Sequence, residues 1–396
     1  MTSKKITYRY MIHQTLYFMY LAGASAFATT YLLAKGFDAS QVGILLALSG
    51  VLSCIVQPLV GDFADRLKKF ILPQIIAALF VGAFACFAVI QFLQPPLLIF
   101  GSLYCIALFL PGLTNSLNNS LCAYYTNHGY QVNYGAGQGA GSLSFSIASL
   151  AFGYIIAWFG VDSMLSVVLV LNIILIIVIL KYPKLPDREM SVESVEEGSF
   201  EERVSIIEFF GKYKLYVFTL VGVMMEAMCH VMIENYFIEI FKGIGGGSEH
   251  VGIALFVACT TAVPYFFLFE KMRKKVGIHV FLRMGGIFFM LKATLLLFAT
   301  QIWHVYLIQL LQLFTYGFIH QPLYYLARAR VSQADLVKGQ AVSVSMYLLG
   351  TAAGNYVGGV TIENWGVKFM LMLALTIATI GAVIINMTLG KEKRCE

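Results

Sequence analysis

Three ionisable residues are spaced so that they share one face of a helix. Glu226, His230 and Glu234 follow one another at intervals of four residues inside a long apolar stretch, and residues four apart on an α-helix lie one above the other. Carboxylates and an imidazole in apolar surroundings are suited to taking up and releasing protons. The alternative to a proton-carrying role is that Glu234 reaches water and His230 only hydrogen-bonds a backbone carbonyl. A zinc site is a further interpretation of these three residues. No fourth ligand has matching spacing, so we expect no metal.

Two more ionisable residues lie within apolar stretches. Lys292 is about 20 Å from the cytoplasmic end of its predicted helix at 1.5 Å per residue. A buried ammonium requires a carboxylate, and Glu226 is the expected partner. His320 precedes Gln321, and a histidine titrates near neutral pH. His320 is therefore a candidate proton carrier, unless it only hydrogen-bonds its neighbours.

The first half of the chain has neutral polar residues where the second half has charged ones. Asn115 and Asn119 follow a proline-glycine break, and Gln138 lies in a glycine-rich helix. Together with Gln321, their amides donate and accept hydrogen bonds, which suits a neutral polyol, sugar or nucleoside better than an anion. The asparagines would otherwise only hydrogen-bond between helices.

The composition assigns these residues to membrane-spanning helices. The chain of 396 residues is 59% hydrophobic and 12% charged, whereas a soluble globule has about twice that charged fraction. A helix needs roughly 20 apolar residues to cross a bilayer. We therefore expect an all-α polytopic membrane protein with twelve transmembrane helices. The predicted spans are 10–33, 41–61, 71–92, 97–125, 134–159, 163–181, 213–241, 250–269, 278–300, 303–327, 338–362 and 367–389.

The basic residues predict the orientation. Of the 27 lysines and arginines, 22 fall on the side of the two termini and three on the other side. The positive-inside rule therefore places both termini in the cytoplasm of a multi-pass protein of the cell membrane. The net charge of +6 follows from this topology and indicates no nucleic-acid partner. The seven cysteines show no Cys-x-x-Cys spacing, so neither disulfides nor metal are expected.

Internal repeats indicate two halves with the same orientation. The motif around Gly43 recurs around Gly252, and the Gly-Gln pair at Gly137 recurs at Gly339, at offsets of 209 and 202 residues. Repeats of this length predict two pseudo-symmetric six-helix bundles with the substrate between them. The predicted parts are an N-terminal bundle (1–182), a cytoplasmic linker (183–212) and a C-terminal bundle (213–396).

The segment after the second span carries a recognisable pattern. It reads Gly61-x-x-x-Asp65-Arg66-x-Lys68-Lys69 and resembles the signature loop of the major facilitator superfamily. A glycine lets two helices approach closely, and an Asp-Arg pair is able to clasp a neighbouring helix end. The resemblance implies transport by alternating access, with Gly61, Asp65 and Arg66 in conformational gating.

Further motifs resemble the oligosaccharide and nucleoside proton symporters, the branch that includes lactose permease. They are Tyr134 to Ser142, Gln57-Pro58 and Gly339-Gln340. The resemblance implies proton coupling at Lys292 and His320. Acidic residues on the seventh helix of that branch correspond to Glu226 and His230. Glu234 is a further candidate for proton coupling. It places a sugar-stacking aromatic at Phe145.

The departures from that branch are informative. The arginine that grips a galactoside corresponds to Gln138, and its acidic partner falls in an uncharged stretch near Ser120. We therefore expect a proton-coupled transporter of a small polar solute, a sugar, oligosaccharide or nucleoside, with import favoured.

Other functional classes remain open. A proton-antiport exporter of drugs or metabolites is the main alternative, and a non-transporting sensor or a lipid translocase is a third class. No nucleotide-binding loop or catalytic triad is apparent, so no enzyme is expected. The partners would be the solute, protons and the lipid bilayer, with no cofactor beyond the proton gradient and a monomeric state.

Overall fold

The computed structural model describes residues 3–66, 72–183 and 205–389, and in these ranges every regular element is helical. Apolar runs with few charges fold as helices in a bilayer because a helix satisfies its backbone hydrogen bonds internally. The helices of the first half are α1 (Ser3–Leu21), α2 (Ala28–Ala34), α3 (Ala39–Arg66), α4 (Leu72–Leu93), α5 (Leu97–Asn127), α6 (Tyr134–Phe159) and α7 (Asp162–Leu180). Those of the second half are α8 (Ile206–Lys212), α9 (Lys214–Glu234), α10 (Phe237–Lys242), α11 (Ser248–Arg273), α12 (Ile278–Leu297), α13 (Ile302–Gln309), α14 (Phe318–Arg330) and α15 (Leu336–Thr388).

The all-α membrane architecture is confirmed, and the number of spans is consistent with twelve. By length and composition, nine helices of the described residues are able to cross a membrane, or ten if α1 and α2, bent by 41°, form one span. One of the nine is the stretch Gln333–Thr388, with 56 residues. At 1.5 Å per residue it is nearly three times as long as the hydrocarbon core is thick, about 30 Å. It is broken at Gly366, where the backbone is not helical, so it supplies two predicted spans.

The break in α15 has a counterpart in the first half. Gly366 has φ 81° and ψ 173°, and Gly160, between α6 and α7, has φ 82° and ψ 166°. A positive φ of this kind is readily adopted only by glycine. Two glycines with the same conformation at repeat-related positions explain why Phe-Gly-Val and Trp-Gly-Val recur in the sequence.

Glycines in α6 allow α1 to pack closely. A Cβ at Gly137 would lie 2.4 Å from the Tyr10 ring, and one at Gly141 would lie 2.6 Å from the Phe18 ring. In the second half, a Cβ at Gly350 would lie 2.3 Å from the carbonyl oxygen of Met224. The glycine-rich motifs therefore place aromatic rings or backbone directly on the helix surface, which is how small residues act in membrane packing.

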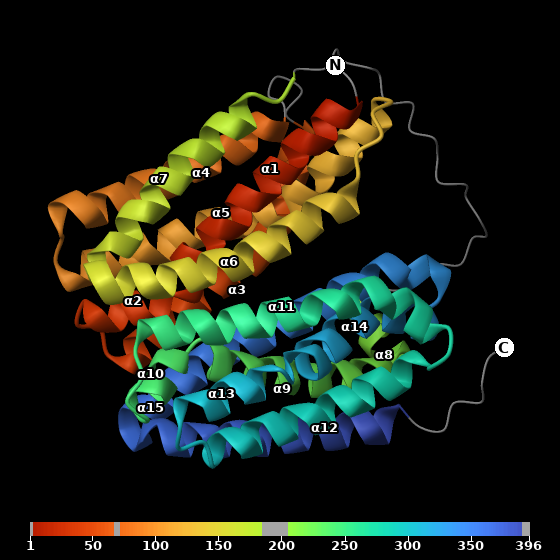
Figure 1. Cartoon of the computed structure of the whole chain (residues 1–396). Coiled ribbons are helices and arrows are strands. Elements are labelled where there is room, and N and C mark those ends of the chain that lie inside the picture. The colour runs from red at the N-terminus through yellow and green to blue at the C-terminus, as the bar shows by residue number, and fades with distance from the viewer. Residues whose placement is uncertain (1–2, 67–71, 184–204, 390–396) are drawn as a thin grey trace.

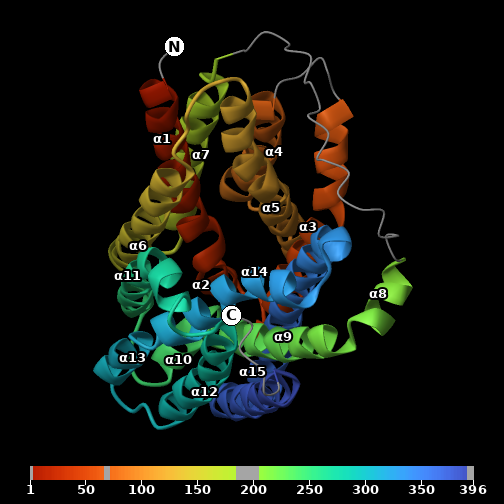
Figure 2. The ribbon, with the colours of Figure 1, turned by 90° about the vertical axis from the view of Figure 1, so that its right-hand side faces the viewer.

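The two halves form separate bundles that touch through two helix pairs (Figures 1 and 2). α6 meets α11 on one side, and α3 meets α15 on the other. Figure 1 shows the bundles diverging toward the end of the molecule where α1 begins and α15 ends, next to the two termini in sequence.

The contacts between the bundles occur far from the termini. A Cβ at Gly252 would lie 3.0 Å from the Cα of Gly153, and the Ser248 hydroxyl donates to the Gly153 carbonyl at 3.2 Å. At the other pair, the Ala39 amide donates to Oε2 of Glu363 at 3.1 Å. The bundles are thus closed at the end opposite the termini.

Candidate functional site

A buried ion pair lies in the C-terminal bundle. Nζ of Lys292, on α12, is 2.6 Å from Oε1 of Glu234, at the end of α9, and 2.7 Å from Oε1 of Gln312. The side chains of Lys292 and Glu234 are 1% and 10% exposed. Charges this deep persist only when they are paired and hydrogen-bonded, and here the ammonium has both a carboxylate and an amide oxygen.

Gln312 is positioned by an irregular turn. It precedes a π-helical turn (Leu313–Gly317) between α13 and α14, and Thr315 Oγ1 lies 3.4 Å from its Oε1. Such turns interrupt the regular helix ladder and frequently occur at functional sites. We did not predict a role for Gln312 from the sequence, although a glutamine in an apolar span was an available signal.

The expected pairing of Lys292 with Glu226 is wrong. Glu226 is fully buried, and neither of its carboxyl oxygens has a hydrogen-bond partner among the residues that the structure describes. It lies two helical turns from Glu234 on α9, which is about 12 Å at 1.5 Å per residue. Spacing along the chain indicated one helix face correctly, but it could not indicate which acid of α9 lies level with Lys292 on α12.

Glu226 occupies a slot left by two glycines. Its Oε1 lies 3.1 Å from the position that a Cβ would take at Gly286, on α12, and 3.0 Å from that position at Gly381, on α15. The carboxyl group is thus packed among three helices, away from the Lys292 ion pair.

A row of aromatic rings joins the predicted histidines. The His230 ring is 5.4 Å from the Tyr316 ring, and the Tyr316 ring is stacked on the His320 ring at 5.0 Å. The row begins at His320, whose side chain is exposed, and reaches His230, one turn before Glu234 on α9. His320 also contacts the Tyr347 ring edge-on at 5.9 Å. Tyr316 is therefore a second residue that we did not predict.

The neutral polar residues of the predicted substrate site lie on α5, α6 and α14. Asn115 is exposed, whereas Gln138, Phe145 and Gln321 are half-buried. Gln138 donates to the Tyr134 hydroxyl at 2.9 Å, one turn away on α6. Asn119 is part of α5, but its side chain lies outside the described part of the chain.

The predicted gating residues lie at the C-terminal end of α3. The backbone of Gly61, Asp65 and Arg66 continues this helix, so the signature segment is helical up to Arg66. Their side chains, and all of Lys68 and Lys69, lie outside the described residues.

The linker helix α8 is fastened to the loop before α15. Oδ2 of the fully buried Asp335 accepts from the Tyr213 hydroxyl at 3.0 Å and from Lys212 at 3.3 Å, and Lys338 lies 3.4 Å from Oδ1. Desolvation opposes the charge of Asp335, but these hydrogen bonds and the lysine charge prevail and lower its pKa. The carboxylate is therefore ionised throughout the physiological range.

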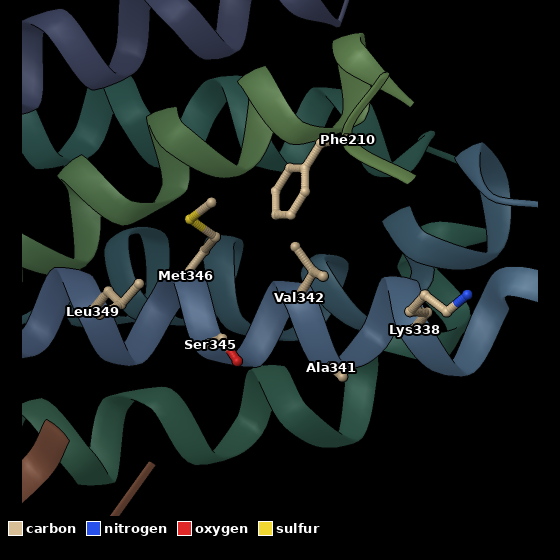
Figure 3. Close-up of a pocket in the computed structure, with 7 residues that line it drawn as sticks. All are labelled: Phe210, Lys338, Ala341, Val342, Ser345, Met346 and Leu349. Carbon is tan, nitrogen blue, oxygen red and sulfur yellow. The ribbon is translucent and has the colours of Figure 1, made fainter. Parts of the chain in front are cut away.

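Beside this cluster, α8 and α15 form an apolar groove of about 320 Å³ (Figure 3). Phe210 points from the linker helix toward Val342, and Lys338 lies at the end of the groove. The groove is lined by Phe210, Lys338, Ala341, Val342, Ser345, Met346 and Leu349. This lining is too apolar to take a polar solute, so we do not assign the transport site to it.

Two bundles of membrane helices that meet at one end define a secondary transporter of the major facilitator fold. A family model confirms this class: residues 8–373 match the MFS_1-like family, and the chain belongs to it. No curated protein sequence matches the chain.

Several solved transporters share the fold at low sequence identity. A mutant of the nucleoside transporter NupG has a TM-score of 0.82 and 14% identity, over 97% of this chain and 100% of that one. A bacterial homologue of the human lysosomal transporter Spinster, inward-facing and unoccupied, has a TM-score of 0.71 and 12% identity, over 98% and 97%. The POT family transporter PepTSo has a TM-score of 0.71 and 11% identity, over 96% of each chain. These proteins are all transporters, and none is an enzyme.

Proposed function

We propose that this protein imports a small neutral polar solute, a nucleoside or a sugar, together with protons. The observation that carries the proposal is the ion pair between Lys292 and Glu234, which is buried and bonded to Gln312. An ion pair in a low-dielectric interior is sensitive to the arrival of one proton, because a neutral partner no longer compensates the remaining charge.

In this proposal a proton enters at His320, which is exposed, and approaches the ion pair along the ring row. Tyr316 lies between His320 and His230, and His230 is one turn from Glu234 on α9. Protonation of Glu234 neutralises the carboxylate and leaves Lys292 with the Gln312 oxygen alone. The ammonium then has to find other acceptors, and this rearrangement favours a different packing of α9 against α12. Glu226 is a second acid of the same bundle that is able to take up a proton.

The solute site in this proposal combines neutral amides with an aromatic ring. Asn115, Asn119, Gln138 and Gln321 supply hydrogen-bond donors and acceptors, and Phe145 supplies a face for a sugar or base. The structural likeness to a nucleoside transporter supports testing nucleosides first.

Transport follows from rocking of the two bundles. The described contacts hold the end opposite the termini closed, while the bundles diverge at the other end. In the state that is open at the other end, the end near the termini has to close. This closure would involve Gly61, Asp65 and Arg66, at the cytoplasmic end of α3.

We propose that the protein is a monomer in the cell membrane with both termini in the cytoplasm and no cofactor besides the proton gradient. A single cysteine at Ser332 would then react with an impermeant thiol reagent only from the cytoplasmic side. One at Ser163 would react only from outside.

The function is tested in proteoliposomes with an imposed pH gradient. We expect an acidic exterior to drive uphill accumulation of a labelled nucleoside or sugar, and a protonophore to abolish it. A panel of nucleosides, sugars and lipophilic cations identifies the solute class. Accumulation of the solute that requires an acidic interior, and not an acidic exterior, would indicate the antiport exporter instead. Accumulation that follows a sodium gradient and ignores pH would contradict proton coupling.

A further inference from the structure

A basic groove lies on the surface of the N-terminal bundle, where α1 begins and α7 ends. Its volume is about 570 Å³, and its lining residues come from these two helices and the residue that follows α7. They are Lys4, Lys5, Tyr8, Arg9, Ile12, Val178 and Lys181. The proposed transport mechanism uses none of them.

The described residues that line the groove carry charge of one sign. Of these seven, four are lysine or arginine and none is acidic. Lys4, Lys5 and Lys181 are exposed, so their ammonium groups are free to approach a ligand from solvent. Cations held this close together repel one another, and an anion bound among them relieves the repulsion.

Arg9 is held in place between the two helices. Its guanidinium donates to the backbone carbonyl of Lys181 and lies 5.9 Å from the centre of the Tyr182 ring. Arginine fixed in this way presents its remaining N–H groups in a constant direction, which suits the oxygens of a phosphate. The groove therefore has one hydrogen-bonded cation, Arg9, beside three exposed ones.

The groove also has an apolar side. Ile12 and Val178 are half-buried and lie farther from the start of α1 and from the end of α7 than the basic residues. Ile12 is three residues beyond Arg9, about 4.5 Å deeper at 1.5 Å per residue. Tyr8 is 66% exposed, as is usual for an aromatic ring at the membrane interface. A ligand that fits has an anionic head and an apolar tail.

We propose that this groove binds an anionic phospholipid of the cytoplasmic leaflet, with its phosphate among the four basic residues and an acyl chain along Ile12 and Val178. Basic pockets between membrane helices on the cytoplasmic side hold such headgroups. The inference depends on the cytoplasmic location of the termini but not on the identity of the transported solute. A bound lipid bridges α1 and α7 at the point where Arg9 already joins them.

The proposal is tested by lipid binding to the delipidated full-length protein in neutral detergent. Native mass spectrometry measures retention of phosphatidylglycerol and of phosphatidylcholine with the same acyl chains. We expect the anionic lipid to bind preferentially. The triple variant Lys4→Gln, Lys5→Gln, Lys181→Gln is expected to weaken its binding about tenfold or more, given the attraction of each lysine for anionic lipid.

Matched variants separate a built site from general charge. Lys271→Gln, Lys274→Gln, Lys275→Gln removes three exposed lysines at and just after the end of α11 and should leave binding unchanged. Lys4→Arg, Lys5→Arg, Lys181→Arg should retain it. Equal loss in both glutamine variants, or equal retention of the two lipids by the natural protein, would overturn the proposal. Displacement of the lipid by millimolar glycerol phosphate would show instead that the groove recognises a free phosphate.

Discussion

Lys292 and Glu234 are 58 residues apart in the sequence, and their charged atoms meet at 2.6 Å inside the C-terminal bundle. Removing either charge alone strands the other, so Lys292→Gln or Glu234→Gln should each destabilise the fold by about 3 kcal/mol or more. The double variant should recover part of this loss, because no charge is left unpaired. Thermal unfolding in detergent measures the cycle.

A second double-mutant cycle serves as the control and pairs Lys292 with Glu226 in place of Glu234. Since Glu226 does not contact Lys292, the losses in the double variant Glu226→Gln, Lys292→Gln should be additive within about 0.5 kcal/mol. Coupling between Glu226 and Lys292 that equals the coupling of Lys292 with Glu234 would contradict the arrangement of α9 and α12.

The slot around Glu226 predicts the effect of small substitutions. Gly286→Ala or Gly381→Ala places a methyl group about 3 Å from the carboxyl oxygen, and overpacking of this kind costs roughly 1–3 kcal/mol. Gly50→Ala is the control, because a Cβ at Gly50 would have no described atom within 4 Å apart from the nearby backbone of its own helix. Thermal unfolding should show lower stability for the first two variants only. A loss that also appears in Gly50→Ala would mean that the slot is not the cause.

Closure between α6 and α11 depends on close backbone approach. A Cβ at Gly252 would lie 2.7 Å from the carbonyl oxygen of Ser149, so Gly252→Trp should hold the bundles apart at this end. We expect Cys259, half-buried on α11, to react faster with an impermeant thiol reagent added outside, in a background without the other cysteines. Gly50→Trp should leave the rate unchanged. Unaltered labelling in Gly252→Trp would show that this end does not need the contact to close.

The linker cluster predicts a specific pH dependence of stability. The pKa of Asp335 is lowered, so the stability it supplies is complete above its ordinary value of about 3.9 and is lost as pH falls through the lower folded value. Asp335→Asn should therefore lower the midpoint of thermal unfolding by a constant amount between pH 5 and 8. The difference from the natural protein should shrink below about pH 4.

Glu239→Gln serves as the control for this experiment. It removes an exposed pair with Lys242, and such surface pairs contribute little. A difference between Asp335→Asn and the natural protein that grows as the solution is acidified would contradict the assignment.

The sequence predicted the helices well because each span is a long apolar run with a clear end. The structure also explains why the same residue recurs at Gly160 and Gly366, since both positions have the same positive φ. The candidate site was harder to predict. Helix periodicity fixes which residues of α9 share a face, but the depth at which α12 presents Lys292 depends on tertiary packing. That packing selected Glu234 and left Glu226 in a glycine slot.

Gln312 and Tyr316 were missed for a related reason. Both lie at or in a π-helical turn, which shifts the register of side chains relative to a regular helix. No simple sequence pattern marks such a turn, so the side chains that it aims at Lys292 and His230 become evident only in the folded structure.

His320 provides the test of the proposed coupling route. Its ring is exposed and stacked on Tyr316, which in turn lies 5.4 Å from His230. A histidine exchanges protons near neutral pH, whereas glutamine keeps a similar size and hydrogen-bonding capacity without that exchange. His320→Gln should therefore abolish uphill accumulation driven by a pH gradient, while exchange of solute at equal concentrations on both sides continues.

The matched control for this test is His304→Gln, which removes a histidine from the far end of the same helical stretch, where it contacts Trp303. It should leave gradient-driven uptake within about twofold of the natural protein, because the proposed route does not include it. Accumulation measured in the same proteoliposomes compares the two variants. Undiminished gradient-driven accumulation in His320→Gln would move the proton-binding role to Glu234 or Glu226, because these are the acids of α9 that remain able to take up a proton in that variant.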